Sequence, residues 1–274
     1  MSIPLRFDFF AKTDVGMVRP ENEDAIAISE VLQLAILADG MGGYNAGEVA
    51  SGIATVTIQH AVERHQRENQ YSHPDDQPAV RRLCLIQAVR KANSTIIETA
   101  RQHPEYRGMG TTVVLAWFQG DCVSIAHVGD SRAYVLRNGE LAQLTRDHSL
   151  VQEQISAGLL TQEQAAFAMN RNVITRAVGV EHQLVVDVQE QAVEVGDLFL
   201  LCSDGLSDRL SPLQIKNIIN ATSDDSKAAC ELLIKAANEG GGQDNISVVL
   251  IKVVNNDAQN DSQCSAAEQL KPSH

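Results

Sequence analysis

The chain has 274 residues, 44% hydrophobic and 21% charged, as in ordinary globular proteins, and this length can bury a full hydrophobic core. Its 22 basic and 35 acidic residues give a formal charge of −13, which argues against nucleic-acid binding and against docking on anionic lipid. A phosphorylated substrate remains compatible with this charge, because one arginine or metal ion near the phosphate can outweigh distant surface carboxylates.

Cysteine spacing and the first residues indicate the compartment. The five cysteines are widely spaced and form no C-x-x-C pair, which favours reduced thiols. Arg6 and Asp8 interrupt the apolar start, unlike in a secretory signal peptide, and no apolar run approaches the ~20 residues of a membrane span. We therefore expect a cytoplasmic protein without a membrane segment. No apolar stripe is left over for self-association, so we expect a monomer.

In the first third of the chain, alternating apolar residues around 7–9 predict a strand, and further strands follow a turn and end at Asp39. Asn45 and Glu48 have the spacing of a helix cap, so a helix is expected from there to about Arg67.

A second helix is predicted over 79–102, because a proline follows two residues later. Apolar runs at 113–118 and 122–128 predict two strands joined by a glycine turn. Asn138 and Gly139 predict the tip of a hairpin.

Residues 147–179 interrupt this strand-rich region and are interpreted as an inserted flap. Asp147 is expected to cap a short helix that ends at Gly158, and Thr161 with Gln164 predicts a capping box for another.

Strands are predicted again after the flap, and two helices precede the last strand. These elements are strands at 184–193, 196–204 and 245–253, a helix from Pro212, and a helix over 225–238. The polar residues 255–274 have little to bury and are expected to form a disordered tail. Hairpins outnumber strand–helix–strand units, which predicts an α+β fold with largely antiparallel sheets, in one domain.

Four aspartates lie at the ends of apolar runs: Asp39, Asp130, Asp204 and Asp244. Gathering carboxylates costs free energy through repulsion and desolvation, and multivalent cations remove that cost. Mg²⁺ and Mn²⁺ take oxygen ligands, whereas no His or Cys has the spacing that zinc needs here. Spacing alone leaves both a shared metal site and four independent turns open.

Two other interpretations fit the residues poorly. The glycines at 40–47 miss the G-x-G-x-x-G spacing of a nucleotide-binding loop, and Asp39 would repel a pyrophosphate. A serine hydrolase lacks support, because there is no G-x-S-x-G motif and Ser131 has no identifiable base.

Eight motifs occur in order: "RPENEDA" (19–25), "ADGMGGYNAGE" (38–48), "GMGTT" (108–112), "HVGDSRAY" (127–134), "LTRDHSL" (144–150), "NVITRAVG" (172–179), "LCSDGLSD" (201–208) and "GGQDNISVV" (241–249). Together they resemble the bacterial metal-dependent serine/threonine protein phosphatases of type 2C (the PPM family), over about residues 8–254. The resemblance implies a four-layer α-β-β-α sandwich of two antiparallel sheets flanked by helices, with the flap inserted. Residues 1–254 would then form the catalytic domain.

The resemblance also implies a two-ion Mn²⁺ or Mg²⁺ centre. By position in the motifs, Asp39 bridges both ions, the Gly40 carbonyl binds the first, and Asp204 and Asp244 bind the second. A side chain larger than that of glycine at Gly40 is expected to crowd the ion.

Further roles follow from the same motifs. Glu23 and Asp24 are expected to hold metal-bound waters, and Arg19 to bind the substrate phosphate. Without the resemblance, Arg19 would be assigned to a surface ion pair with Glu21 or Glu23. A weaker third ion of bacterial relatives would use Asp130 and Asp204. Asp147 and Asp208 are the other candidates for that ion.

The implied reaction is attack of a metal-bridging hydroxide on the phosphorus of phosphoserine or phosphothreonine, opposing a bacterial Ser/Thr kinase. The alternatives are a non-catalytic phosphoprotein-binding or scaffold member, and a phosphatase of anti-anti-sigma-type regulators. Tyr44 stands where some relatives have a histidine, so a proton-donor role there is in doubt. His127 is expected on a strand face, and His148 at the start of the flap.

Overall fold

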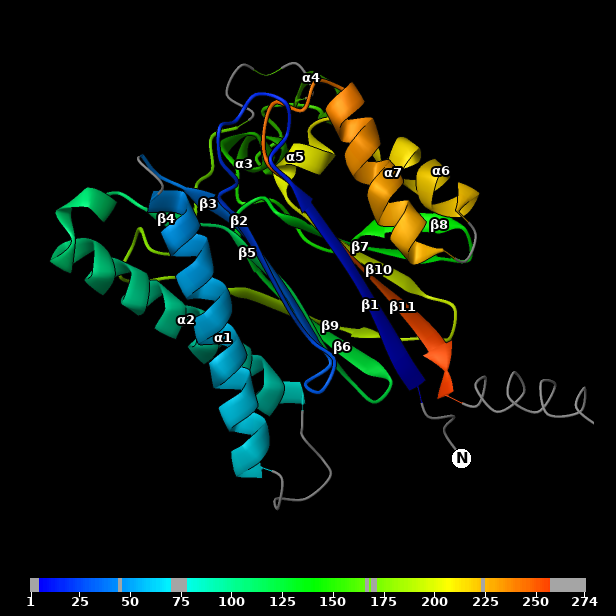
Figure 1. The fold of residues 1–274 in the computed structure, drawn as a ribbon, viewed down its shortest axis with the longest axis horizontal. Helices are drawn as coiled ribbons and strands as arrows, with labels where there is room; N and C mark the ends of the chain where they lie inside the picture. Colours follow the sequence, from blue (N-terminus) through cyan, green and yellow to red (C-terminus); the bar gives the residue numbers. More distant parts are fainter. Residues whose placement is uncertain are drawn as a thin grey trace, which may run out of the picture.

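The protein is described by a computed structural model that covers residues 5–43, 46–69, 78–165, 168, 172–222 and 225–256. Two antiparallel sheets pack face to face, and helices cover the outer face of each (Figure 1). The predicted four-layer α-β-β-α sandwich is thus confirmed. Tyr44, Asn45, residues 169–171 and the expected tail beyond 256 lie outside the described residues.

Each sheet combines strands from distant parts of the chain. The first has the order β1 (Leu5–Asp14), β11 (Ile246–Asn255), β10 (Leu198–Cys202), β7 (Arg132–Arg137), β8 (Glu140–Gln143). The second has the order β2 (Asp24–Ser29), β3 (Leu34–Met41), β5 (Val113–Gln119), β6 (Cys122–Val128), β9 (Asp187–Ala192), with β4 (Gly110–Thr111) beside β3. The predicted hairpin tip is confirmed, with φ of 51° at Asn138 and 77° at Gly139.

The helices divide between the two outer faces and the flap. On the second sheet lie α1 (Ala46–Asn69), α2 (Pro78–Gln102) and the short 3₁₀ turn η1 (Pro104–Tyr106); on the first lie α5 (Asp204–Ser207), α6 (Pro212–Ala221) and α7 (Ser226–Glu239). The flap carries α3 (Leu150–Ser156) and α4 (Gln162–Ala165). Among the described helices, none has the length and apolar character needed to cross a bilayer.

One predicted helix cap is wrong and one is confirmed. Helix α3 is capped by Ser149, whose side chain accepts from the Gln152 N–H, and not by Asp147. Asp147 is unavailable because its carboxylate receives the guanidinium of Arg132 at 2.6–3.0 Å. The capping box of α4 is present as predicted, with reciprocal Thr161–Gln164 hydrogen bonds of 2.8 and 3.3 Å.

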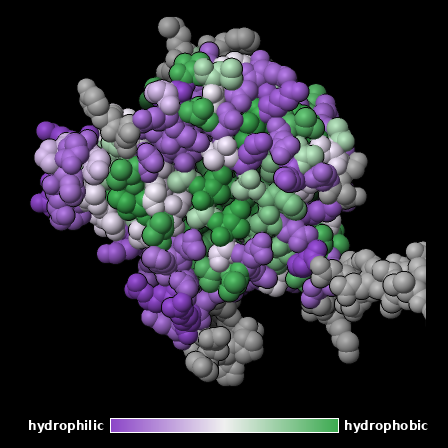
Figure 2. All heavy atoms as spheres, in the orientation of Figure 1, coloured by the Kyte–Doolittle hydropathy of each residue, from purple (hydrophilic) through white to green (hydrophobic). Residues whose placement is uncertain are grey.

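An apolar layer between the sheets holds the sandwich together. Phe118 lies at its centre, with ring centroids 4.6 Å from Phe7 and 5.3 Å from Phe199. Phe9 and Ile26, from the edge strands β1 and β2, are only partly buried against this layer. Figure 2 shows the surface of the molecule in the view of Figure 1, with hydrophobic residues along its middle and hydrophilic residues over the helix layers on either side.

Side-chain alternation turns one end of this apolar layer acidic. On β3, Ala35 and Leu37 pack between the sheets, so the period of two brings Asp39 to the same face. Ile26 sets the same phase for Asp24 on β2, and Asp24 pairs directly with Asp39 in the register. The end of the inter-sheet layer is therefore where the carboxylates gather.

The two ends of the flap lie side by side. The Leu150 N–H donates to the Val173 carbonyl at 2.9 Å, and the Thr175 N–H donates to the His148 carbonyl at 2.8 Å. Val178 then forms a bridge to Thr111, next to β3. The described part of the flap is therefore tied at its base to β4, which pairs with β3, the strand that carries Asp39.

Candidate metal and active centre

A cavity of about 260 Å³ opens at the acidic end of the sandwich. Its lining contains seven of the eight predicted site residues: Arg19, Glu23, Asp39, Gly40, Asp130, Asp204 and Asp244. Asp24, the eighth, pairs with Asp39 in the sheet. Asn172 and Ile174 bring the flap to the rim. The tertiary structure therefore brings together residues up to 225 positions apart in sequence.

The backbone of Asp39 is held rigidly at the cavity. Its N–H donates to Thr112 Oγ1 at 3.1 Å, and its carbonyl accepts from Thr111 Oγ1 and from the Thr112 N–H, both at 2.8 Å. Burial raises the pKa of Asp39 well above its usual value, and the charges of Asp24 and Asp204 add to the effect. This carboxylate is costly to ionise unless a cation lies beside it.

Two neighbouring carboxylates have a buried oxygen without a partner among the described residues. These atoms are Oδ1 of Asp24 and Oδ1 of Asp204. The other oxygen of Asp24 accepts from Ser203 Oγ at 2.9 Å. Burial raises the pKa of Asp24 to about 6, and burial followed by the charge of Asp130 raises that of Asp204 well above normal. A group of several carboxylates that offers only oxygen ligands fits hard divalent ions such as Mn²⁺ and Mg²⁺.

Gly40 is required by backbone packing. A Cβ there would lie 2.2 Å from the Gly47 carbonyl oxygen and 2.5 Å from the Glu23 carbonyl oxygen. The Gly40 N–H also donates to Glu23 O at 3.1 Å. This backbone constraint is separate from the expected crowding of an ion, which stays a prediction, and it arises because α1 begins directly against β3 at this point.

The side chain of Glu23, which precedes β2 in the chain, lies against the first turn of α1. Its Oε1 accepts from the Gly47 N–H at 3.2 Å, and its own carbonyl accepts from Ser51 Oγ at 2.6 Å. Burial raises the pKa of Glu23, although the Gly47 hydrogen bond opposes that change. The carboxylate is thus held at the cavity wall by the helix.

Asn245 is a positioning residue that the sequence did not reveal. It is 5% exposed, and its Nδ2 donates to the carbonyls of Val15 and Glu21 at 3.0 and 2.9 Å. Its Oδ1 accepts from the Glu23 N–H at 2.8 Å. One amide therefore holds the loop that carries Arg19. Its position beside Asp244 in a motif was the available signal, but its partners are more than 220 residues away.

Arg19 reaches the rim of the cavity. Its Nη2 donates to Asp244 Oδ2 at 2.7 Å, and the Arg19 side chain is 49% exposed. The surface pairing with Glu21 or Glu23 is therefore replaced by a contact with a predicted metal ligand. Burial disfavours the charged guanidinium, but the hydrogen bond to Asp244 and the nearby negative charges together outweigh it, so the pKa of Arg19 is raised.

The candidates for a third ion separate into two groups. Asp130 lines the cavity, and burial followed by the charge of Asp147 raises its pKa to about 6. Asp147 instead forms the ion pair with Arg132, at the base of the flap. Asp208 is absent from the described lining of the cavity, and its N–H donates to the Asp204 carbonyl at 2.7 Å.

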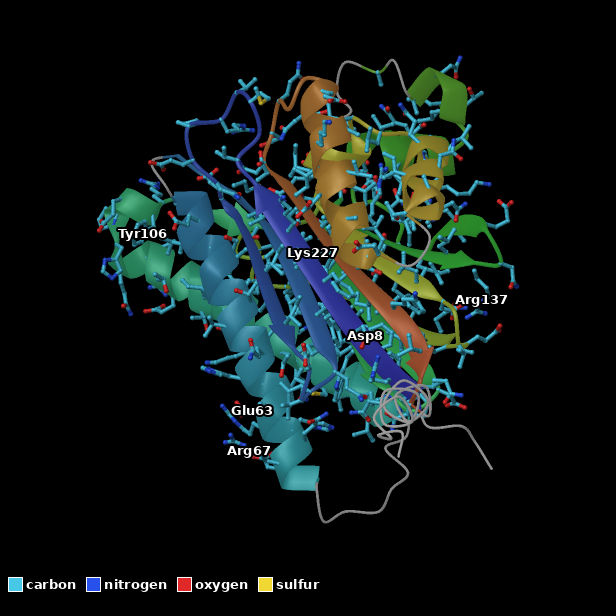
Figure 3. All side chains as sticks on the ribbon, turned by 45° about the vertical axis from the view of Figure 1, so that its right-hand side comes forward. Asp8, Glu63, Arg67, Tyr106, Arg137 and Lys227 are labelled. Atoms are coloured by element: carbon cyan, nitrogen blue, oxygen red, sulfur yellow. The ribbon has the colours of Figure 1, made fainter. Side chains whose placement is uncertain are left out.

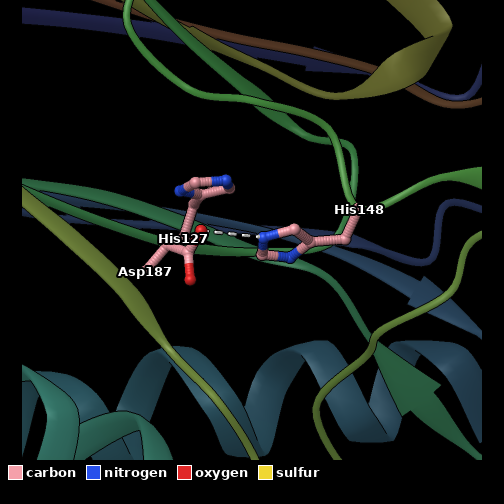
Figure 4. A group of neighbouring side chains, drawn as sticks. All are labelled: His127, His148 and Asp187. Carbon is pink, nitrogen blue, oxygen red and sulfur yellow. Dashed lines mark hydrogen bonds and ion pairs between the residues drawn. The ribbon is translucent and has the colours of Figure 1, made fainter. Parts of the chain in front are cut away.

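A second cluster of potential metal ligands lies apart from this lining. Ligand atoms of His127, His148 and Asp187 come within 4.8 Å of one another (Figure 4). However, Arg176 Nη1 lies 2.9 Å from His148 Nε2 and 3.2 Å from Asp187 Oδ1. A guanidinium thus already supplies a positive charge at this cluster.

These histidines form the anchor of the flap. The rings of His127 and His148 stack with centroids 4.6 Å apart, and His148 Nδ1 accepts from the Gly129 N–H at 3.1 Å. Burial, then the neighbouring His127 and Arg176, lowers the pKa of His148 to about 4. The cluster joins the start of the flap to its end, as expected for His148, and His127 lies on strand β6 as expected.

Comparison with known proteins gives a consistent picture. A sequence model described as protein phosphatase 2C matches residues 20–225. Serine/threonine protein phosphatase PstP of Mycobacterium tuberculosis is 37% identical over 257 residues, covering 93% of this chain but only 46% of the relative. Serine/threonine phosphatase stp of Listeria monocytogenes is 35% identical over 244 residues, covering 88% of this chain and 94% of the relative.

Solved structures match this chain at a similar sequence identity. The M. tuberculosis phosphatase PstP superposes with a TM-score of 0.80 at 34% identity, covering 90% of this chain and 98% of that one. The catalytic domain of PstP in complex with two manganese ions superposes with a TM-score of 0.78 at 36% identity, covering 91% and 99%.

Proposed function

Since this chain belongs to the protein phosphatase 2C family, we propose that it is a metal-dependent hydrolase of phosphoserine and phosphothreonine in phosphoproteins. The observation that carries the proposal is the single cavity wall shared by Asp39, Asp204, Asp244 and Arg19. A non-catalytic binding protein has no need to retain several buried carboxylates, which destabilise the fold unless cations are bound.

The cofactor would be two Mn²⁺ or Mg²⁺ ions, with a weaker third ion near Asp130. Asp39, the Gly40 carbonyl, Asp204 and Asp244 would hold the two ions, in line with the two manganese ions of the PstP catalytic domain. Divalent ions so held supply Lewis acidity, which lowers the pKa of water and offsets phosphate charge.

The protein's own groups would orient the reactants. Arg19 would exchange its bond to Asp244 for the phosphate oxygens, and its planar guanidinium can bind two of them. Glu23 and Asp24 would accept hydrogen bonds from water in the cavity. The rigid backbone of Asp39 and the Asn245 contacts would keep these groups in place between turnovers.

The physiological partners would be proteins phosphorylated by a Ser/Thr kinase, including the kinase itself. We assign the protein to the cytoplasm, since the described cysteines Cys84, Cys122, Cys202 and Cys230 are free thiols. We also expect a monomer. Size-exclusion chromatography with light scattering and cell fractionation test these two assignments.

Phosphate release from a phosphothreonine peptide with Mn²⁺ tests the reaction. We expect turnover by the wild type and a loss of about 100-fold or more in Asp39→Ala. The matched control is Asp121→Ala, in the exposed β5–β6 turn. Activity that survives in Asp39→Ala would refute the assignment of the site. Peptide binding without turnover by the wild type would favour the non-catalytic alternative.

A further inference from the structure

An open groove of about 500 Å³ lies beside the proposed active cavity. It is formed by the end of α2, the η1 turn and the end of the flap, on the side of the molecule where Figure 3 labels Tyr106. Ile97 and the 58% exposed Val180 give the lining its apolar surface, above the almost fully buried Met109. The groove can therefore accept an apolar side chain of a partner.

The groove and the cavity share a wall. Met41 lines the cavity and Val180 lines the groove. A Cβ at Gly110 would lie 2.9 Å from Met41 Cε and 3.1 Å from Val180 Cγ2, so both side chains flank this one residue. A peptide whose phosphate enters the cavity can therefore cross Met41 and continue directly into the groove.

The charge of the groove differs from that of the molecule. The exposed Arg101 and Arg107 belong to its lining, and none of the described lining residues carries a carboxylate. The chain as a whole has a formal charge of −13. Charges beyond about 8 Å are screened at physiological ionic strength, so an approaching acidic segment responds to these two arginines and to the few glutamates beside them, of which Glu98 pairs with Arg101.

We propose that this groove binds an acidic and apolar segment of the phosphoprotein substrate, next to the phosphorylated residue. The proposal rests on the proposed phosphatase function and adds substrate selectivity to it. An aliphatic side chain would pack on Ile97 and Val180, while neighbouring Asp or Glu residues would pair with Arg101 and Arg107. The ion pair of Arg101 with Glu98, 3.4 Å long and exposed, is weak enough to be exchanged.

Two phosphothreonine peptides test the proposal. They share the residues next to the phosphothreonine, and one carries Leu-Glu-Glu clusters at both ends where the other carries Ala-Ser-Ser. We expect wild-type protein to hydrolyse the acidic peptide with about fivefold higher kcat/KM, through KM, because each exposed pair contributes modestly. The double variant R101A/R107A should lose this preference and keep its activity on p-nitrophenyl phosphate.

The matched control is Lys227→Ala, which removes an exposed cation from α7 on the other helix layer (Figure 3). It should keep the preference. Equal wild-type kcat/KM for the two peptides, or a preference that persists in R101A/R107A, would overturn the proposal. Failure of the phosphatase assignment is distinguishable, because no substrate would then turn over. Fluorescence anisotropy of labelled peptides would still report whether the acidic one binds more tightly through the two arginines.

Discussion

Replacing Asp130 by asparagine should stabilise the metal-free protein, although it alters a proposed functional residue. Burial and the charge of Asp147 raise the pKa of this carboxyl from 3.8 to about 6. Since one pKa unit corresponds to about 1.4 kcal/mol, holding the ionised form in the fold costs about 3 kcal/mol. Asparagine carries no charge, so at pH 7.5 we expect a gain of about 1–3 kcal/mol after the change in hydrogen bonding.

The sign of the pH dependence follows from the raised pKa. Below pH 3.8 Asp130 is protonated in both the folded and unfolded protein, and its favourable contribution is fully present. That contribution is lost as the pH rises through about 6, because over this range the folded protein keeps a proton on Asp130 that the unfolded chain has already released. The advantage of Asp130→Asn should therefore be small near pH 4 and largest above pH 7.

Urea denaturation in EDTA across pH 4–8 measures this effect, with Asp121→Asn as an exposed control. Thermal unfolding gives a second measurement, in which a gain of 1 kcal/mol in the free energy of unfolding raises the Tm by about 2–4 °C for a chain of this size. Excess Mn²⁺ should narrow the difference, because bound cations relieve the repulsion in the wild type. An Asp130→Asn protein that is no more stable than the wild type at pH 7.5 in EDTA would refute this electrostatic explanation.

Three further outcomes are expected. Asn245→Ala leaves two carbonyls and one N–H without their partner, so the free energy of unfolding measured with urea should fall by about 3 kcal/mol. The KM for a phosphopeptide should rise, because the loop that carries Arg19 loses its support. An unchanged KM would contradict the positioning role. Gly40→Ala should cost about 3 kcal/mol or more in the same assay, whereas Gly43→Ala, where nothing lies within 4 Å, should be tolerated; equal effects would contradict the packing argument. The pKa of His148 is lowered from 6.5 to about 4, so its contribution to stability is present above pH 6.5 and is lost as the pH falls toward 4. His148→Gln should therefore flatten this loss of stability at acid pH, by up to about 3 kcal/mol in the difference from wild type at each pH. Parallel pH profiles of the two proteins would exclude His148 as the source.

Local pattern in the sequence determined the elements and the motifs. Periods of two and 3.6, proline stops and the Asn138–Gly139 turn placed most helices and strands within a few residues of their observed bounds. The ordered motifs brought the family, the sandwich and the candidate carboxylates with them. The prediction of Asp147 as the cap of α3 is wrong, because Asp147 forms an ion pair with Arg132, a partner that no local sequence pattern indicates.

Only the tertiary structure decided which of these groups touch. Arg19 meets Asp244 across 225 positions, and Asn245 supports the Glu23 backbone across 222. The register of β2 against β3 sets Asp24 opposite Asp39; Asp24 Oδ1 is buried without a partner among the described residues, and burial raises the pKa values of both carboxyls. Burial and charge proximity depend on distances through space, whereas sequence patterns record the short-range periodicity of single elements. The cavity is therefore a property of the packed sheets.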